Sequence, residues 1–390
     1  MSWEYKTLDQ LGEVSRGRSK HRPRNDPSLF GGKYPFIQTA DVKAANFYIT
    51  EYDTTYNEKG LAQSRLWNPG TLCITIAANI ADTGILAMDA CFPDSVMGFL
   101  PYEGIADVRF VKYCFDILQQ NCKKISQGAA QDNLSWEKLS TILFPAPPIE
   151  VQTKIADILS TYDNLIENNQ KQIKLLEEAA QRLYKEWFVD LRFPGHETTP
   201  IVDGVPEGWK EQSLYQIADV VMGQSPKSEY YNQVGEGLPF HQGVGSYGNR
   251  FVSDETYSTS FTRIAEAGSI LFSVRAPVGR LNLTKNKVVI GRGLAAINHR
   301  REAQSYLFYL LKEKFFRDDI IGNGSIFASI SKEELLNQTF LIPIDSLVGQ
   351  FNGIAGGIDK KIDILSEQIR LLTEARNRLL PKLMSGEIEV

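Results

Sequence analysis

A run of alternating cations near the N-terminus is the part of the sequence best suited to binding a polyanion. The segment SRGRSKHRPR, residues 15–24, contains no acidic residue and has a positive charge at every second position: Arg16, Arg18, Lys20, Arg22 and Arg24. This density of charge can neutralise several phosphates, and an arginine can also grip guanine through two hydrogen bonds. Glycine and proline within the run predict a loop. The loop is predicted to contact nucleic acid, the alternative being an ordinary solvated charged face.

A second set of cations lies in the other half of the chain. The segment GQSPKSEYYNQ, residues 223–233, matches the basic loop in position but carries only Lys227. The other residues predicted to bind DNA are Lys33, Arg250, Arg263, Arg275, Arg280 and Arg292. Gln38 and Gln242 occupy matching positions, where each is either a reader of adenine or a structural amide. Two halves that bind DNA through different residues must prefer different sequences.

Motifs of catalysis are missing from the sequence. The histidines are scattered, the four cysteines form no CxxC pair, and GVGSYG (residues 243–248) does not continue as a helix that could bind a pyrophosphate. FPAPP (residues 144–148) is not the Asn/Asp-Pro-Pro-aromatic motif of an amino-methyltransferase, and no nuclease-like acidic triad stands out. We therefore expect a non-catalytic chain that binds no metal or cofactor itself. With no signal peptide and no membrane-length apolar run, we expect it to be cytoplasmic.

An internal repeat organises the whole chain. Residues 2–19 resemble 208–225, residues 34–42 resemble 238–244, and residues 70–80 resemble 268–278, in the same order. The short β-branched segments bounded by glycine predict strands, and each half ends in a long helix. The Pro/Gly-rich segment 194–208 joins the halves. The sequence thus predicts a tandem duplication.

The two long helices share a coiled-coil pattern. Steps of four and three residues connect a seam in the first helix, which consists of Ile155, Leu159, Tyr162, Ile166, Asn169, Ile173, Leu176, Ala180, Leu183 and Trp187. Adding 196 to each number gives the second seam, which consists of Phe351, Ala355, Ile358, Ile362, Leu365, Ile369, Leu372, Arg376, Leu379 and Leu383. Two unrelated amphipathic surface helices are the alternative. Asn169 and Arg376 either fix the register or lie at solvated edges.

These patterns predict an α+β fold. Two strand-rich α/β domains would be related by a pseudo-two-fold axis and separated by a pair of long antiparallel coiled-coil helices. The predicted segments are a first domain (1–147), a central helix (148–193), a linker (194–207), a second domain (208–342) and a C-terminal helix (343–390). The glycines of residues 349–357 predict that the second helix begins late, near Ile358, and Pro381 should end or kink it.

The chain resembles the specificity subunit of type I restriction-modification systems. The resemblance is carried by residues 144–159, 175–195 and 371–390, and within the domains by residues 70–86 and 133–148. It implies two target recognition domains that read a bipartite, asymmetric double-stranded DNA sequence. It also implies partners: two methylation subunits that bind S-adenosylmethionine and dock on the helices, and restriction subunits that use ATP and Mg²⁺. The exposed helix faces would hold docking residues such as Lys171, Lys174, Glu178, Arg182, Arg370, Glu374 and Arg378.

Two other functions remain open at this stage. One is a self-contained DNA methyltransferase or nuclease whose motifs have drifted. The other is a structural or anti-restriction protein that uses its coiled coil for assembly and does not touch DNA.

Overall fold

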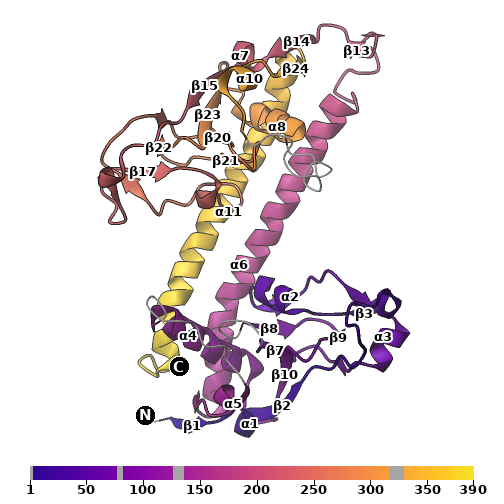
Figure 1. The fold of residues 1–390 in the computed structure, drawn as a ribbon, viewed down its shortest axis with the longest axis vertical. Coiled ribbons are helices and arrows are strands. Elements are labelled where there is room, and N and C mark those ends of the chain that lie inside the picture. The colour runs from indigo at the N-terminus through magenta and orange to yellow at the C-terminus, as the bar shows by residue number, and fades with distance from the viewer. Residues whose placement is uncertain (1–2, 77–81, 126–135, 316–328) are drawn as a thin grey trace. The chain divides into compact units, whose positions relative to one another are not determined.

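The computed structural model describes residues 3–76, 82–125, 136–315 and 329–390, and the chain forms two compact units. The first unit contains Met1–Gln172 and Leu365–Val390, and the second contains Ile173–Ile364. Helices α6 (Ile149–Tyr184) and α11 (Asp345–Met384) each contribute one part to each unit (Figure 1). This division differs from the predicted one, in which each helix was a domain of its own.

A five-stranded sheet forms the centre of the first unit. Its strand order is β2-β10-β7-β8-β4, with β4 and β8 parallel and the other neighbours antiparallel. The strands are β2 (Gly12–Arg16), β10 (Val96–Pro101), β7 (Leu72–Thr75), β8 (Thr83–Leu86) and β4 (Tyr48–Ile49). Three small pairs surround it: β1 (Glu4–Lys6) with β11 (Phe144–Ala146), β3 (Phe30–Pro35) with β5 (Thr55–Tyr56), and β6 (Leu66–Trp67) with β9 (Ala90–Cys91). The helices are α1 (Leu8–Leu11), η1 (Pro27–Leu29), α2 (Thr39–Ala44), α3 (Glu58–Ala62), α4 (Val108–Ile125) and α5 (Trp136–Leu139).

The second unit contains two larger sheets. One has the order β15-β23-β20-β21, formed by β15 (Ala218–Met222), β23 (Leu294–His299), β20 (Ile270–Ser273) and β21 (Leu281–Leu283). The other has the order β16-β18-β17-β22-β19, formed by β16 (Tyr231–Asn232), β18 (Tyr257–Ser258), β17 (Leu238–His241), β22 (Val288–Ile290) and β19 (Ile264–Ala265). Also present are the pairs β14 (Lys210–Ser213) with β24 (Thr339–Ile342) and β12 (Ile201–Val202) with β13 (Val205–Pro206). The helices are α7 (Leu214–Ile217), η3 (Ser228–Tyr230), η4 (Val244–Ser246), α8 (Gln304–Phe315) and α10 (Lys332–Leu336).

The predicted duplication is confirmed strand by strand. The order β2-β10-β7-β8 in the first unit corresponds to β15-β23-β20-β21 in the second. In each copy of the repeat the first strand pairs with the strand that precedes the long helix, as β1 with β11 and β14 with β24. A capping box opens the short helix that follows the first strand in both copies, with Thr7 and Gln10 in one and Ser213 and Gln216 in the other.

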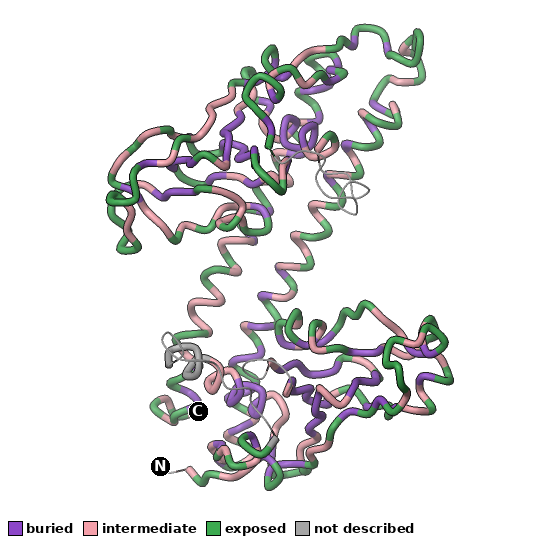
Figure 2. Tube along the Cα trace, in the orientation of Figure 1, coloured by how far each residue is buried: buried purple, intermediate pink, exposed green. Residues whose placement is uncertain are grey.

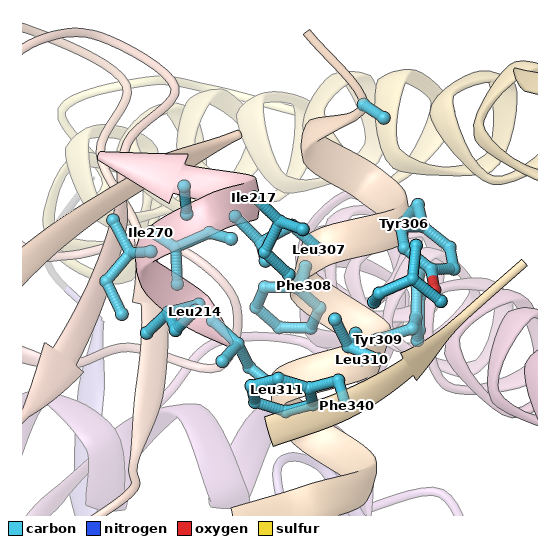
Figure 3. Packing of buried hydrophobic residues seen from close by; sticks show 14 of the residues in the cluster. Leu214, Ile217, Ile270, Tyr306, Leu307, Phe308, Tyr309, Leu310, Leu311 and Phe340 are labelled. Carbon is cyan, nitrogen blue, oxygen red and sulfur yellow. The ribbon is translucent and has the colours of Figure 1, made fainter. Parts of the chain in front are cut away.

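Each unit has its own hydrophobic core. In the first, apolar residues of β7, β8, β10 and α4 pack with Ile155 and Leu159 of α6 and with Leu380 and Leu383 of α11. In the second, α8 buries an unbroken apolar run, Tyr306–Leu311, against Leu214 and Ile270 (Figure 3). Buried residues concentrate along these central elements (Figure 2). Burial on all sides of the run Tyr306–Leu311 explains why α8 was not predicted as a separate element, since periodicity is weak in such runs.

The predicted seam residues of the two helices lie away from solvent within the units. Every predicted seam residue is buried or half-buried. In the first unit, Asn169 Nδ2 donates to Gln368 Oε1 at 3.2 Å, and Arg376 pairs with Asp163, so numbers rise along α6 as they fall along α11. This order makes the helices antiparallel there. The last residue of the first seam, Trp187, lies outside regular α-helix, in a π-helical turn (Lys185–Val189) that follows α6.

The predicted start of the second helix was wrong, and Pro381 does not end it. Helix α11 begins at Asp345, thirteen residues before Ile358, and it continues past Pro381 to Met384. Its first turns bury Leu347, Val348, Phe351 and Ala355 in the core of the second unit. That burial outweighs the cost of about 1 kcal/mol for each glycine in a helix. Pro381 lacks the N–H that would donate to the carbonyl four residues back, but only three helical residues follow it.

Candidate nucleic-acid interface

The basic loop leaves the edge strand β2 in an extended conformation. Gly17 N donates to Val96 O at 2.8 Å and Arg18 N donates to Phe92 O at 2.9 Å. A Cβ on Gly17 would lie 2.3 Å from Pro93 O, so only glycine allows this close approach. Gly17 and Ser19 are buried between exposed neighbours. Successive side chains of an extended chain point to opposite sides, so the three cations at positions 16, 18 and 20 share the exposed side.

Residues 63–65 hold the other side of this loop. Gln63 Oε1 accepts from Lys20 N at 2.6 Å and from His21 N at 3.0 Å. Ser64 Oγ donates to Arg18 O at 2.8 Å. The loop is therefore fixed through its backbone, which leaves its cationic side chains exposed.

The end of the loop is closed by polar contacts. Asp26 accepts from Ser28 N at 2.9 Å and lies 2.7 Å from His21 Nε2. Hydrogen bonds from the backbone and side chain of Ser28, and then from His21, lower the pKa of Asp26 to about 2. Arg24 is exposed but pairs with Asp94 at 2.8 Å, and Arg22 Nη1 donates to two carbonyls of its own loop. Arg16, Arg18 and Lys20 are thus the best placed of the predicted cations.

Lys33 and Gln38 lie elsewhere in the first unit. Lys33 pairs with Glu58 at 3.3 Å, and hydrogen bonding to Tyr34 and then to Glu58 raises its pKa. Gln38 is exposed at the N-terminus of α2, and its Nε2 donates to Thr54 Oγ1 at 3.3 Å. This contact favours the structural role for Gln38 that the sequence left open.

The second unit rebuilds the same backbone with other side chains. Gly223 N donates to Leu294 O and Gln224 N donates to Ile290 O, both at 2.9 Å. A Cβ on Gly223 would lie 2.1 Å from Gly291 O. Met222, Gln224 and Pro226 stand where the first unit has Arg16, Arg18 and Lys20. This shared backbone arrangement, which we call the platform, therefore carries different side chains in the two units.

Several predicted residues of the second half meet around the end of β22. Ile290 N donates to Arg263 O at 2.9 Å, Gly293 N donates to Gln242 O at 3.1 Å, and Arg292 N donates to Ser225 Oγ at 3.2 Å. The side chains of Gln242, Arg263 and Arg292 are exposed there. These hydrogen bonds do not link the other predicted residues to the end of β22. Lys227 pairs with Glu229 at 3.8 Å, Arg275 is exposed and Arg280 is half-buried.

Arg250 has a structural environment that disagrees with its predicted role. It is 4% exposed, pairs with Asp359 of α11 and stacks on Phe308 at 3.7 Å. A buried guanidinium held by a carboxylate and a ring is not presented to a phosphate or a base. We therefore leave Arg250 out of the candidate interface.

Two residues near the interface were missed by sequence reasoning. His241 is buried, with Nδ1 2.9 Å from Ser246 Oγ and Nε2 3.1 Å from Asp254 Oδ1, and it fixes the segment after β17. A lone histidine gave no signal for this. Arg65 is exposed beside the basic loop, and the repeat offered a signal, since Gly70 aligns with Gly268 and Arg65 therefore with Arg263.

The described residues contain neither of two other features. No group of three or more His, Cys, Asp or Glu side chains in that part of the chain could hold a metal ion. No helix there is both long and apolar enough to cross a membrane. Cys73, Cys91 and Cys114 are buried thiols whose pKa is raised by that burial, and the side chain of Cys122 lies outside the described set.

The fold and the basic site define a protein with two copies of a domain suited to recognising DNA. Residues 1–178 and 206–376 each match the family model described as type I restriction modification DNA specificity domain. The chain therefore belongs to the type I restriction-modification DNA specificity family. Two copies of this domain fit the recognition of a target in two parts.

Individual relatives agree with the family match. A putative type I restriction enzyme MjaX specificity subunit from Methanocaldococcus jannaschii is 34% identical over 268 residues, which is 67% of this chain. The chain spans only 62% of the length of that relative. The MjaIX specificity subunit of the same organism is 25% identical and aligns with 100% of this chain and 94% of its own length. The crystal structure of a type I S subunit from M. genitalium has the same fold, with a TM-score of 0.62, 15% identity and coverage of 98% and 96%.

Proposed function

We propose that this chain is the DNA-reading subunit of a type I restriction-modification complex. Its first unit reads one half of a bipartite, asymmetric double-stranded target, and its second unit reads the other half. The observation that carries this proposal is one backbone platform built twice with different side chains. At the platform the first unit exposes Arg16, Arg18 and Lys20, whereas the second exposes Gln224 alone and has Met222 half-buried and Pro226 buried at the other two positions. Identical frames with different contacts read two different sequences.

The proposal assigns all catalysis to partner subunits. Two methylation subunits would bind S-adenosylmethionine and modify the DNA, and restriction subunits would supply ATP- and Mg²⁺-dependent cleavage. The relatives support this division, because each is named as a specificity subunit of a restriction enzyme. Within this assembly the chain contributes sequence preference and a scaffold.

Exposed apolar side chains on the long helices are suited to docking the methylation subunits. The first unit exposes Ile158 on α6 and Leu371 on α11. The shift of 196 residues gives their equivalents in the second unit, Ile354 and Leu175, which are also exposed. Exposed apolar groups at equivalent positions of both units fit two copies of one partner. Arg370, Glu374 and Arg378 form ion pairs along α11 and would border this surface.

DNA reading is tested by mapping methylated adenines in cells that express this chain with its methylation subunit. The control cells lack only this chain. We expect a bipartite motif that appears only with the chain. Methyl transfer or cutting by the purified chain alone, with S-adenosylmethionine and Mg²⁺, would instead support a self-contained enzyme. Unchanged methylation in the cells would remove DNA reading as the function.

Docking is tested by the stoichiometry of the purified complex. Ile158→Asp and Ile354→Asp place a charge in one apolar surface each, so native mass spectrometry should show the loss of one methylation subunit from each variant and of both from the double variant. Asn164→Asp adds the same charge at another exposed position of α6 and should leave the complex intact. A double variant that still carries two methylation subunits would contradict the assigned surface.

A further inference from the structure

Arg65 lies beside the start of the basic loop. Residues 63–65 run alongside residues 15–21: Gln63 binds the backbone of Lys20 and His21, and Ser64 binds that of Arg18. At the end of this contact, Arg65 Nη1 donates to Ser15 Oγ at 2.9 Å. Ser15 directly precedes Arg16 in the chain. The Arg65 side chain is 41% exposed and so remains open to a ligand.

A stack of rings fixes the plane of the Arg65 guanidinium. The guanidinium carbon lies 3.8 Å from the centre of the Trp67 ring, and Trp67 stacks on Phe92 with ring centres 4.7 Å apart. Gly98 of β10 makes room for the indole, since a Cβ there would lie 2.5 Å from the Trp67 ring. Phe92 O also accepts from Arg18 N. The same stack therefore supports both the guanidinium and the basic loop.

Glu13 holds the guanidinium of Arg65 from a further side. Its carboxylate lies 3.6 Å from Arg65 Nη2 and is itself more than half exposed. The Trp67 ring, the Ser15 hydroxyl and the Glu13 carboxylate together restrict the Arg65 side chain. An unrestricted arginine side chain carries about 2 kcal/mol of rotamer entropy. A phosphate contact gains little from such restriction, because an ammonium or guanidinium can meet a phosphate from many directions. A bidentate contact with guanine requires a planar fork held in one orientation.

The internal repeat sets a contrast at the same position. Arg65 corresponds to Arg263, but Trp67 corresponds to Ala265, so the second unit has the arginine without the ring. The main chain of Arg263 is held by Ile290, and its side chain is exposed. Charge is thus common to both units, whereas the fixed orientation belongs to the first unit.

We propose that Arg65 reads a guanine in the half of the target that the first unit contacts. Arg16, Arg18 and Lys20 hold the neighbouring phosphates, and Trp67 is a positioning residue that acts through Arg65. Arg263 supplies charge in the second unit without this selectivity. The assignment rests on the proposed DNA-reading function and adds to it a base and a residue.

Arg65→Lys is the decisive variant, because it keeps the charge and removes the planar fork. In the complete complex with its methylation subunits, methylation mapping should show that one G·C pair of one half-target loses selectivity by roughly 10- to 100-fold. The other half-target should stay unchanged and serves as the internal control for folding. Arg300→Lys makes the same replacement at an arginine of the second unit that pairs with Asp219 and belongs to no predicted contact with DNA, and it should change neither half.

Trp67 is tested by two replacements. Trp67→Leu removes the aromatic face and should relax the same base pair as Arg65→Lys, whereas Trp67→Phe keeps a ring and should largely restore selectivity. Thermal unfolding of each variant complex reports on folding separately. A purely structural role for Trp67 would lower the melting temperature without singling out one base pair.

The outcomes separate this assignment from the proposed function. A wild-type complex with no bipartite motif would overturn both. A wild-type complex with a motif that Arg65→Lys leaves unaltered would overturn the assignment alone. An Arg65→Ala variant that weakens binding to all sequences equally, and lowers the salt-dependence slope by about one unit, would show a phosphate contact instead.

Discussion

The ion pair between Arg250 and Asp359 supports a prediction about stability that depends on which partner is removed. Arg250 follows η4 and its side chain is 3% exposed, whereas Asp359 of α11 is 16% exposed. Tyr309 Oη lies 3.5 Å from the same Asp359 oxygen, and Phe308 stacks on the guanidinium. The two members of the pair therefore differ in what remains if the other is lost.

Removing the carboxylate should cost more than removing the cation. Asp359→Ala leaves a buried guanidinium without its anion, which costs about 3–5 kcal/mol. Arg250→Met keeps most of the volume and the contact with Phe308, and leaves a carboxylate that can reach water and Tyr309. Its cost should be about 1.5–3 kcal/mol, typical of a lost charged hydrogen bond. Replacing both, as Arg250→Met with Asp359→Leu, should recover part of the loss because no buried charge remains.

Native-state hydrogen exchange is the suitable assay, because a chain with two compact units need not unfold in one step. Amides of β15, β20 and β23 report on the second unit, and those of β2, β7 and β10 serve as the control. Asp359→Ala should lower protection in the second unit about a hundredfold or more, since 1.4 kcal/mol is a factor of ten. Asp219→Ala removes an exposed ion pair with Arg300 and should change the free energy of opening of the second unit by less than about 1 kcal/mol.

The reasoning would be refuted by the opposite order. If Arg250→Met destabilised the second unit as much as Asp359→Ala, the cost would not come from an unpaired buried cation. Equal losses of protection in both units would point to a general effect of mutation instead of a local one.

Three further predictions concern the loop and the pH dependence. Arg18→Ala should lower the slope of log K against log salt by about one unit for all DNA sequences, and a filter-binding titration would reveal an unchanged slope if no phosphate is contacted. Gly17→Ala should abolish reading of the first half-target while sparing the second, because no Cβ fits there; methylation mapping checks this, and normal reading of both halves would contradict it. Burial, and then Arg301, lowers the pKa of His299 below 6.5, so the unfolded chain binds a proton that the folded chain does not. The contribution of His299 to stability should be complete above about pH 6.5 and should be lost as the pH falls from there towards the lowered pKa of the folded chain. Urea titrations should show a smaller fall for His299→Asn. Asparagine keeps an acceptor for the two backbone N–H groups bound by Nδ1.

The duplication and the helix seam were predictable because both are local patterns. A repeat is visible in the order of short motifs, and a seam is visible as alternating steps of four and three residues. The start of α11 was not predictable in the same way. Glycines lower helix propensity locally, but the residues between them, such as Phe351, are buried in a core built from distant segments. Tertiary packing decided the boundary.

The candidate site was predictable only in its charge. Alternating cations with glycine between them indicated an extended basic loop, and the structure shows why the spacing matters. Gln63, which lies 43 residues beyond Lys20, gave no local signal that it would bind the backbone of the loop. Arg250 looked like an available cation because its partner is 109 residues away. Exposure and pairing are properties of the folded chain, and they decide which cations can meet DNA.

The same shift of 196 residues that relates the helix seams also relates two aspartates that each pair with an arginine. Asp163 of α6 accepts from Tyr113 Oη at 2.6 Å and pairs with an arginine of α11, Arg376. Asp359 of α11 lies beside Tyr309, the equivalent of Tyr113, but its arginine is Arg250.

The aspartate on the long helix and the tyrosine on the packed helix are therefore common to both units, whereas the cation comes from the helix partner in one and from the recognition domain in the other. A buried carboxylate requires a cation, but nothing requires that cation to come from a particular element. The helix positions can therefore stay constant while the domain around them changes its contacts. This separation of a constant scaffold from variable reading surfaces is what a protein with two different half-targets needs.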